Sequence, residues 1–277
     1  MEDVLAALTD ALARGEAVAM VTIVAAHGST PQRVGARMLV FSDGRIVGTI
    51  GGGCYENDAF WKAREAITSR RPELVHYELD DDFAQETGLI CGGQMDVYIE
   101  PIEPSPELYV IGAGHVGFQL GQIAPNVGFR LHVVDDRQKF ANRDRFPDAD
   151  EVVVQSLEQW VTTAEIPASA YLVVLTRGHR QDFDVLRALS TRTFRYVGLI
   201  GSRAKVARIY DALVAAQMPP DTLKHVRAPI GLDIGAVTPQ EIAVSILAEL
   251  IAVKHGKAHA ASMKWAPPGL KDEVRRT

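Results

Sequence analysis

Two kinds of hydrophobic periodicity alternate along the first part of the chain and predict a small α+β arrangement. Residues 2–14 repeat apolar positions with helical spacing, whereas residues 17–26 form a valine-rich run that is typical of a buried strand. The segments 38–41 and 45–50 flank the turn sequence Ser-Asp-Gly, which predicts a β-hairpin. The predicted apolar face of the first helix comprises Val4, Leu5, Leu8 and Leu12.

Farther along, short apolar strands alternate with helical stretches. This order predicts a Rossmann-like domain with a doubly wound parallel sheet, whose ligands bind at the carboxyl ends of the strands. The expected strands are 108–111, 131–134, 151–154, 171–175 and 196–200, and the expected helices are 116–124, 157–163, 183–189, 202–217 and an apolar helix from 239 to 253.

A proline-containing connector separates these two patterns, and we place the domain boundary at Ser105. The expected organisation is an N-terminal α+β domain over residues 1–105, a Rossmann-like domain over 106–256 and a loosely ordered tail over 257–277.

The composition and charge of the chain argue against nucleic acid and membrane partners. The chain has 277 residues and a net charge of −6, with Lys and Arg scattered, so no basic stripe favours nucleic acid. Its apolar runs are shorter than the roughly 18 to 20 residues of a membrane span, and its acidic start is unlike a signal peptide. We therefore expect a soluble, cytoplasmic protein whose two cysteines stay reduced.

A glycine motif follows the strand predicted at residues 108–111. Gly112 would allow a tight turn, Gly114 would let backbone N–H groups approach a pyrophosphate, and Gly117 would let the next helix lie close to the strand. Asp135 follows Gly112 by 23 positions, at the spacing of a ribose hydroxyl partner. A βα turn without a ligand is the alternative. His115 inside the motif faces either a ligand or solvent.

The two cysteines lie against glycine runs. Cys54 follows Gly51, Gly52 and Gly53 and precedes the helix predicted at 55–69, where Glu56 complements the helix dipole. Three consecutive glycines suggest a sharp turn or a close approach of the backbone. The helix start favours a thiolate, which is the form that binds metals.

Cys91 repeats this setting, because Gly92 and Gly93 follow it before the strand predicted at 95–100. The alternative is that both cysteines are small, buried hydrophobic residues without a ligand role. A closed zinc site is not supported, since no Cys-x-x-Cys pair or spaced histidine pair completes four ligands. Two thiolates in a glycine-lined pocket favour a soft-ligand metal centre or a sulfur-bearing cofactor instead.

Several basic and hydroxyl residues are candidate anion ligands. His27, Arg33 and Arg37 lie on the segment that enters the hairpin, where a solvated face is the alternative. The segment of Gly201, Ser202 and Arg203 opens a helix and would bind an anion there, although capping alone explains the serine.

Taken together, these segments resemble the XdhC/CoxI family of xanthine dehydrogenase accessory proteins. The resemblance covers nearly the whole chain. It is carried by residues 51–56, 91–93, 112–117, 135–137, 198–203, 229–236 and 238–241.

The resemblance implies a molybdenum cofactor chaperone more than a catalyst, and no catalytic residue is assigned. Such a protein binds molybdopterin cofactor, protects it while a cysteine desulfurase supplies a terminal sulfur, and delivers it to a molybdenum hydroxylase such as xanthine dehydrogenase. Cys54 and Cys91 would face the metal. The expected cofactor-binding set is Cys54, Cys91, Gly52, Gly53, Gly92, Gly112, Gly114, His115, Gly117, Asp135, Gly201, Ser202 and Arg203.

Two alternatives belong to other classes. In the first, an NAD(P)-dependent oxidoreductase holds the dinucleotide in the second half and a small or pterin-type substrate in the first, although fold analogy alone supports hydride chemistry. In the second, a regulatory module senses a nucleotide without turnover. A homodimer is the expected assembly in each case.

Overall fold

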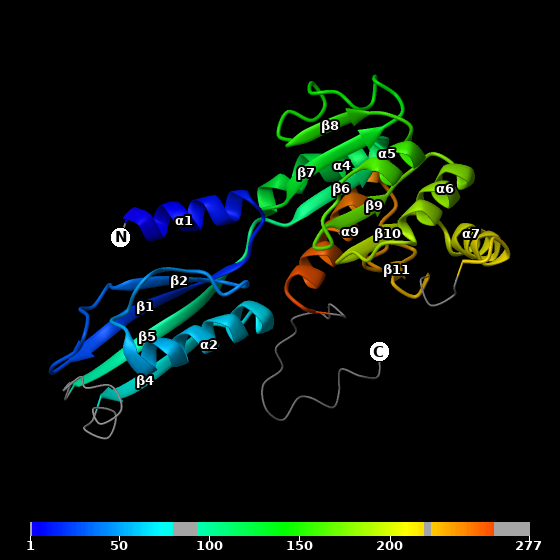
Figure 1. Ribbon diagram of the computed structural model, residues 1–277. Helices are drawn as coiled ribbons and strands as arrows, with labels where there is room; N and C mark the ends of the chain where they lie inside the picture. The colour runs from blue at the N-terminus through cyan, green and yellow to red at the C-terminus, as the bar shows by residue number, and fades with distance from the viewer. Residues whose placement is uncertain (1, 80–92, 219–222, 258–277) are drawn as a thin grey trace, which may run out of the picture. The chain divides into compact units, whose positions relative to one another are not determined.

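The computed structural model describes residues 2–79, 93–218 and 223–257. The chain forms two compact units, Met1–Ser105 and Pro106–Thr277, and each is described here by itself (Figure 1). Cys91 and Gly92 lie outside the described residues, and so does the tail beyond Lys257.

The first unit is built on a five-stranded sheet whose order is β3-β2-β1-β5-β4. Every neighbouring pair is antiparallel. The hairpin predicted across Ser42-Asp43-Gly44 is present as the pair β2 and β3. The strands are β1 (Val18–His27), β2 (Arg37–Phe41), β3 (Ile46–Gly48), β4 (Glu73–Leu79) and β5 (Gly93–Ile102).

Two helices cover opposite faces of this sheet, as alternation along β1 shows. Val18 and Met20 pack with helix α1 (Glu2–Ala13), whereas Val21 and Ile23 pack with helix α2 (Gly53–Ser69). Successive side chains of a strand point to opposite faces, so a sheet that is apolar on both sides requires both helices.

One part of the predicted helical face was wrong. Leu5 is 43% exposed, and the buried residues of α1 are Val4 and Ala11. Leu8 packs at the edge of this small core. The buried face of α1 therefore includes Val4 and Ala11, and Leu5 lies outside it.

The second unit is a six-stranded parallel sheet in the order β11-β10-β9-β6-β7-β8. Counted within the unit, this is the doubly wound strand order of a Rossmann domain, which confirms the predicted fold class. The strands are β6 (Glu107–Ile111), β7 (Arg130–Asp135), β8 (Glu151–Val154), β9 (Tyr171–Val174), β10 (Tyr196–Leu199) and β11 (Val226–Arg227).

Helices cover both faces of the parallel sheet. Leu108 and Val110 of β6 pack on the side of α4 and α9, whereas Tyr109 and Ile111 pack on the side of α5, α6 and α7 (Figure 1). The helices are α4 (His115–Ile123), α5 (Leu157–Thr163), α6 (His179–Leu189), α7 (Arg203–Ala215) and α9 (Pro239–Lys254), with a short 3₁₀ turn η1 (Pro125–Val127).

Within the part of the chain that the structure describes, no helix combines the length and the apolar character needed to cross a bilayer.

Candidate functional site

The glycine run before α2 forms a sharp turn, as its sequence predicted. Gly51, Gly52 and Gly53 have φ angles of 125°, 79° and 81°, in the region that favours glycine. The turn ends at the start of α2, so Cys54 is the second residue of that helix. Its thiol is free and partly exposed.

A carboxylate already accepts hydrogen bonds from the backbone N–H groups of this turn. One oxygen of Glu56 accepts hydrogen bonds from the backbone N–H groups of Ile50, Gly51 and Gly52 at 2.8 to 3.1 Å, and also from the Thr49 hydroxyl. Burial opposes ionisation, yet these bonds outweigh it and hold the pKa of Glu56 below its ordinary value. Glu56 therefore fixes the turn that leads into Cys54.

Replacing Glu56 by alanine is expected to lower the free energy of unfolding by about 2–3 kcal/mol, because a charged acceptor is removed from four donors. The measurement is urea denaturation, together with hydrogen exchange of residues 49–52 as a local readout. Glu65 lies exposed on the same helix, and Glu65→Ala should change stability by less than about 0.5 kcal/mol. Equal effects of the two substitutions would contradict this role.

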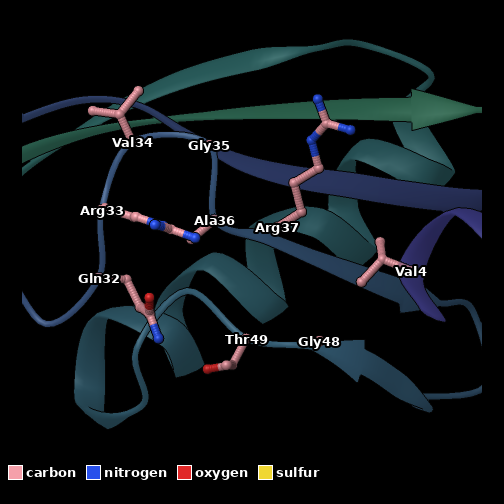
Figure 2. Close-up of a pocket in the computed structure, with 9 residues that line it drawn as sticks. All are labelled: Val4, Gln32, Arg33, Val34, Gly35, Ala36, Arg37, Gly48 and Thr49. Carbon is pink, nitrogen blue, oxygen red and sulfur yellow. The ribbon is translucent and has the colours of Figure 1, made fainter. Parts of the chain in front are cut away.

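A cavity of about 510 Å³ lies beside this turn in the first unit. Arg33, Arg37, Gln32 and Thr49 are among the residues that line it (Figure 2). His27, the third basic residue predicted near this segment, ends β1 opposite Gln94 and is absent from the lining. The structure thus brings two of the three predicted basic residues to one cavity.

The loop after β1 also lies between two glycine segments. A Cβ added to Gly51 would lie 2.7 Å from Pro31 Cβ and 3.3 Å from Gln32 Cγ. A Cβ added to Gly93 would lie 2.6 Å from the Ser29 carbonyl oxygen. Gly51 and Gly93 thus let both segments approach this loop closely, while the predicted placement of Cys91 and Gly92 falls outside the described residues.

The predicted tight turn is present at the carboxyl end of β6 in the second unit. Gly112 has a φ of 113°, and a Cβ there would lie 2.4 Å from the Leu175 carbonyl oxygen. A Cβ on Gly117 would lie 2.2 Å from the Gly112 carbonyl oxygen, so Gly117 allows the predicted close approach of α4. Gly114 caps this helix, and a Cβ on it would meet open space.

His115 begins α4 and is exposed. We predict that a ligand contacts the imidazole of His115 or the backbone of Gly114, and this stays a prediction. These two residues are nevertheless the members of the motif that the fold leaves accessible at the helix start.

Asp135 ends β7 and is 1% exposed. Arg137 donates two side-chain hydrogen bonds to its carboxylate at 2.8 and 2.9 Å, and the backbone N–H of Ala113 donates a third at 2.8 Å. Burial opposes ionisation, but these bonds outweigh it and hold the pKa of Asp135 below its ordinary value. Contact with a ribose, predicted from the spacing, would require displacement of Arg137.

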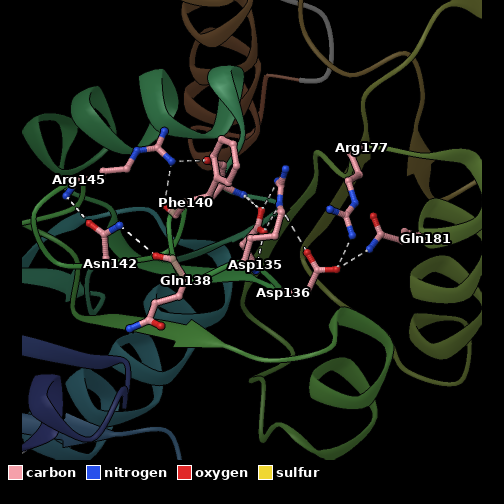
Figure 3. A network of polar contacts seen from close by, with 10 residues as sticks. Asp135, Asp136, Gln138, Phe140, Asn142, Arg145, Arg177 and Gln181 are labelled. Atoms are coloured by element: carbon pink, nitrogen blue, oxygen red, sulfur yellow. Dashed lines mark hydrogen bonds and ion pairs between the residues drawn. The ribbon is translucent and has the colours of Figure 1, made fainter.

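Further polar residues surround this turn, and Figure 3 shows their network. Asp136 accepts hydrogen bonds from Arg177 at 2.8 Å and from Gln181 at 3.1 Å. Arg145 donates to the carbonyl oxygens of Ala113 and Phe140. No local sequence motif marked Asp136, Arg145 or Gln181 as site residues, because the partners that they bind lie far away in the sequence.

The predicted Gly201-Ser202-Arg203 segment opens α7. Ser202 caps the helix by accepting a hydrogen bond from the Lys205 N–H at 3.2 Å, and Arg203 is exposed. The Lys205 side chain forms an ion pair of 2.6 Å with the buried carboxylate of Asp182. This helix start is therefore stabilised internally, and its binding of an anion stays a prediction.

No three His, Cys, Asp or Glu side chains come together as a metal site in the described ranges, 2–79, 93–218 and 223–257. Metal binding by Cys54 together with Cys91 stays a prediction, since Cys91 lies outside those ranges.

Comparison with known protein families gives two matches that together cover most of the chain. Residues 108–250 match the model described as XdhC Rossmann domain, and residues 11–78 match the model described as XdhC and CoxI family.

Individual relatives extend this result. The chain is 36% identical to the uncharacterized protein YqeB of Escherichia coli (strain K12) over 90% of its own length and 46% of YqeB, so it spans about half of that relative. It is 23% identical to the molybdenum cofactor insertion chaperone PaoD of the same organism, over 88% of this chain and 86% of PaoD. A crystal structure described as a xanthine dehydrogenase from Bacillus halodurans matches with a TM-score of 0.52 and 26% identity, over 93% of this chain and 97% of that one.

Proposed function

The chain belongs to the XdhC and CoxI family, and from this premise we propose that it binds molybdenum cofactor as cargo and delivers it to a molybdenum hydroxylase of the xanthine dehydrogenase type. The similarity to a protein named molybdenum cofactor insertion chaperone, which extends over most of both chains, supports this role. The solved relative described as a xanthine dehydrogenase agrees with a link to that class of enzyme.

The observation that carries the proposal is the chemistry gathered in the first unit. Cys54 is a free, partly exposed thiol at the end of a glycine turn that Glu56 fixes. A Cβ added to Gly51 of the same turn would lie 3.3 Å from Gln32 Cγ, and Gln32 lines the cavity with Arg33 and Arg37. Thiolates are preferred ligands of soft metals, and guanidinium groups bind phosphate. A cofactor that contains molybdenum, sulfur and a phosphate group combines both demands.

The finer parts of this proposal concern the cargo and its handling. We assign Cys54 and Cys91 to the metal end of the cofactor, with a cysteine desulfurase as the sulfur donor and protection of the cofactor as the purpose of the site. A homodimer in the cytoplasm is the expected form. The NAD(P) and nucleotide-sensing alternatives place a nucleotide in the second unit, where Arg137 and Ala113 already engage the carboxylate of Asp135 predicted to bind the ribose.

The test is metal and pterin analysis of the protein purified after co-expression with the molybdenum cofactor pathway. Wild type should carry both molybdenum and pterin, and the Cys54→Ser, Cys91→Ser double variant should carry at least about tenfold less, which corresponds to about 1.4 kcal/mol of binding free energy. Asn57→Ser is the matched control, since Asn57 is exposed near the start of the same helix α2.

Two outcomes would count against parts of this proposal. Wild type without molybdenum and pterin would reject the chaperone role. Full retention of both by the double variant would leave that role in place and remove the two cysteines from the site.

A further inference from the structure

The charged side chains that line the cavity of the first unit are both positive. None of the nine residues that line it is acidic, whereas Arg33 and Arg37 both contribute to its wall. Its volume of about 510 Å³ falls in the range of small-molecule sites, roughly 300 to 1,000 Å³. A cavity with these properties suits a small molecule that carries negative charge.

The two guanidinium groups lack partners inside the described part of the chain. Neither Arg33 nor Arg37 forms an ion pair or a side-chain hydrogen bond with residues 2–79, 93–218 or 223–257, and the Nε atom of Arg37 is buried without an acceptor. Arg45, on the same hairpin, pairs instead with both Glu16 and Asp43. A buried N–H without an acceptor is costly, so this arrangement favours an acceptor supplied by a ligand.

The Glu56 carboxylate is bonded to the cavity wall, but most of its hydrogen bonds come from the glycine turn. Thr49 lines the cavity, and its hydroxyl donates to Glu56. The same Glu56 oxygen accepts three backbone N–H groups of the glycine turn. The Glu56 carboxylate is thus stabilised by the uncharged donors of the turn and forms no ion pair with Arg33 or Arg37, so both guanidinium groups can bind another anion.

We propose that this cavity binds the phosphate group of the pterin cargo through Arg33 and Arg37. The guanidinium fork binds phosphate oxygens in pairs, which a single ammonium group does not reproduce. Gln32 provides a neutral amide for the polar edge of the pterin, and Val4 and Val34 provide apolar wall for its ring. The inference rests on the proposed function, because that function supplies the identity of the cargo.

The test compares a double variant, which carries Arg33→Gln and Arg37→Gln together, with wild type and with the control variant Arg71→Gln. Arg71 is exposed in the same unit and forms no ion pair within the described residues. Two quantities are measured, namely the pterin and molybdenum content after co-expression, and the affinity of the unloaded chain for inorganic phosphate by calorimetry. We expect the double variant to lose at least about tenfold in both, with Arg71→Gln unchanged, because each charge-assisted bond contributes appreciably to binding.

The outcomes separate this inference from the proposed function. Equal cofactor content in wild type and double variant would overturn the phosphate site and leave the chaperone role standing. Wild type without cofactor would reject that role, and the phosphate titration would then decide alone. A tenfold loss of phosphate affinity in the double variant would support the anion site. Equal phosphate affinity of the two proteins, or no phosphate binding by wild type, would overturn it. If near-ultraviolet circular dichroism shows that the double variant is unfolded, Arg33→Gln on the exposed loop takes its place with the same readouts.

Discussion

Replacing Gly112 by alanine is expected to lower the free energy of unfolding of the second unit by about 3–5 kcal/mol. The backbone there has a φ of 113°, and the new Cβ would lie 2.4 Å from the Leu175 carbonyl oxygen. Strain of this kind costs about 1–3 kcal/mol, and the clash with the neighbouring strand adds a similar amount, since a backbone carbonyl cannot move aside as a flexible side chain does.

The same motif provides the control for this prediction. A Cβ on Gly114 would meet open space, and its φ of −65° suits any residue. Gly114→Ala should therefore change stability by less than about 1 kcal/mol. Urea denaturation followed by circular dichroism measures both variants. Similar losses for the two substitutions would mean that the turn tolerates a side chain at neither position, and the distinction between a structural and an accessible glycine would fail.

Replacing Asp135 by alanine should cost about 3 kcal/mol. The carboxylate is 1% exposed and accepts hydrogen bonds from Arg137 and from the backbone N–H of Ala113. Its removal leaves the buried N–H without this acceptor and the partly buried Arg137 guanidinium with only the more distant Asp136 carboxylate, at 3.6 Å. Asp144 is exposed in the same unit, and Asp144→Ala should change stability by less than about 0.5 kcal/mol. A small effect at Asp135 would show that the carboxylate is available for a ligand instead.

The effect of Asp135→Ala should also depend on pH. The folded pKa of Asp135 is lowered, so its contribution to stability is complete above the ordinary Asp pKa of about 3.9 and is lost as the pH falls through the folded pKa. The difference in unfolding free energy between wild type and variant should therefore be constant near neutral pH and shrink below about pH 4. Urea midpoints of the two proteins over this pH range provide the measurement.

The fold itself could be predicted from local sequence patterns. The alternation of short valine-rich strands with helices specified a parallel sheet, because a helix between two strands returns the chain to the end of the sheet where the first strand began, so the next strand runs in the same direction. The hairpin across Ser42-Asp43-Gly44 and the start of α2 at the glycine run were predicted for similar reasons, since turn residues act over two or three positions. Strand β4 was missed, and its largely exposed residues explain why hydrophobic periodicity did not reveal it.

The candidate site was accessible only in part. Cys54 was correctly placed at a helix start, because glycine runs and helix patterns are visible in the sequence. Glu56 was expected only to complement the helix dipole, whereas its carboxylate binds the turn before it. The partners of a flexible carboxylate are set by where the backbone N–H groups point, and periodicity does not report that direction.

The sequence by itself determined most of the secondary structure, the doubly wound sheet and the glycines on which its turn depends, because these follow from steric limits and hydrophobic spacing between near neighbours. Only the tertiary structure decided which charges remain available. It joined Asp135 to Arg137 and left Arg33 and Arg37 at a cavity without partners among the described residues. Ion pairing depends on distance and on the competition for each acceptor in three dimensions, and that competition is settled only when the chain has folded.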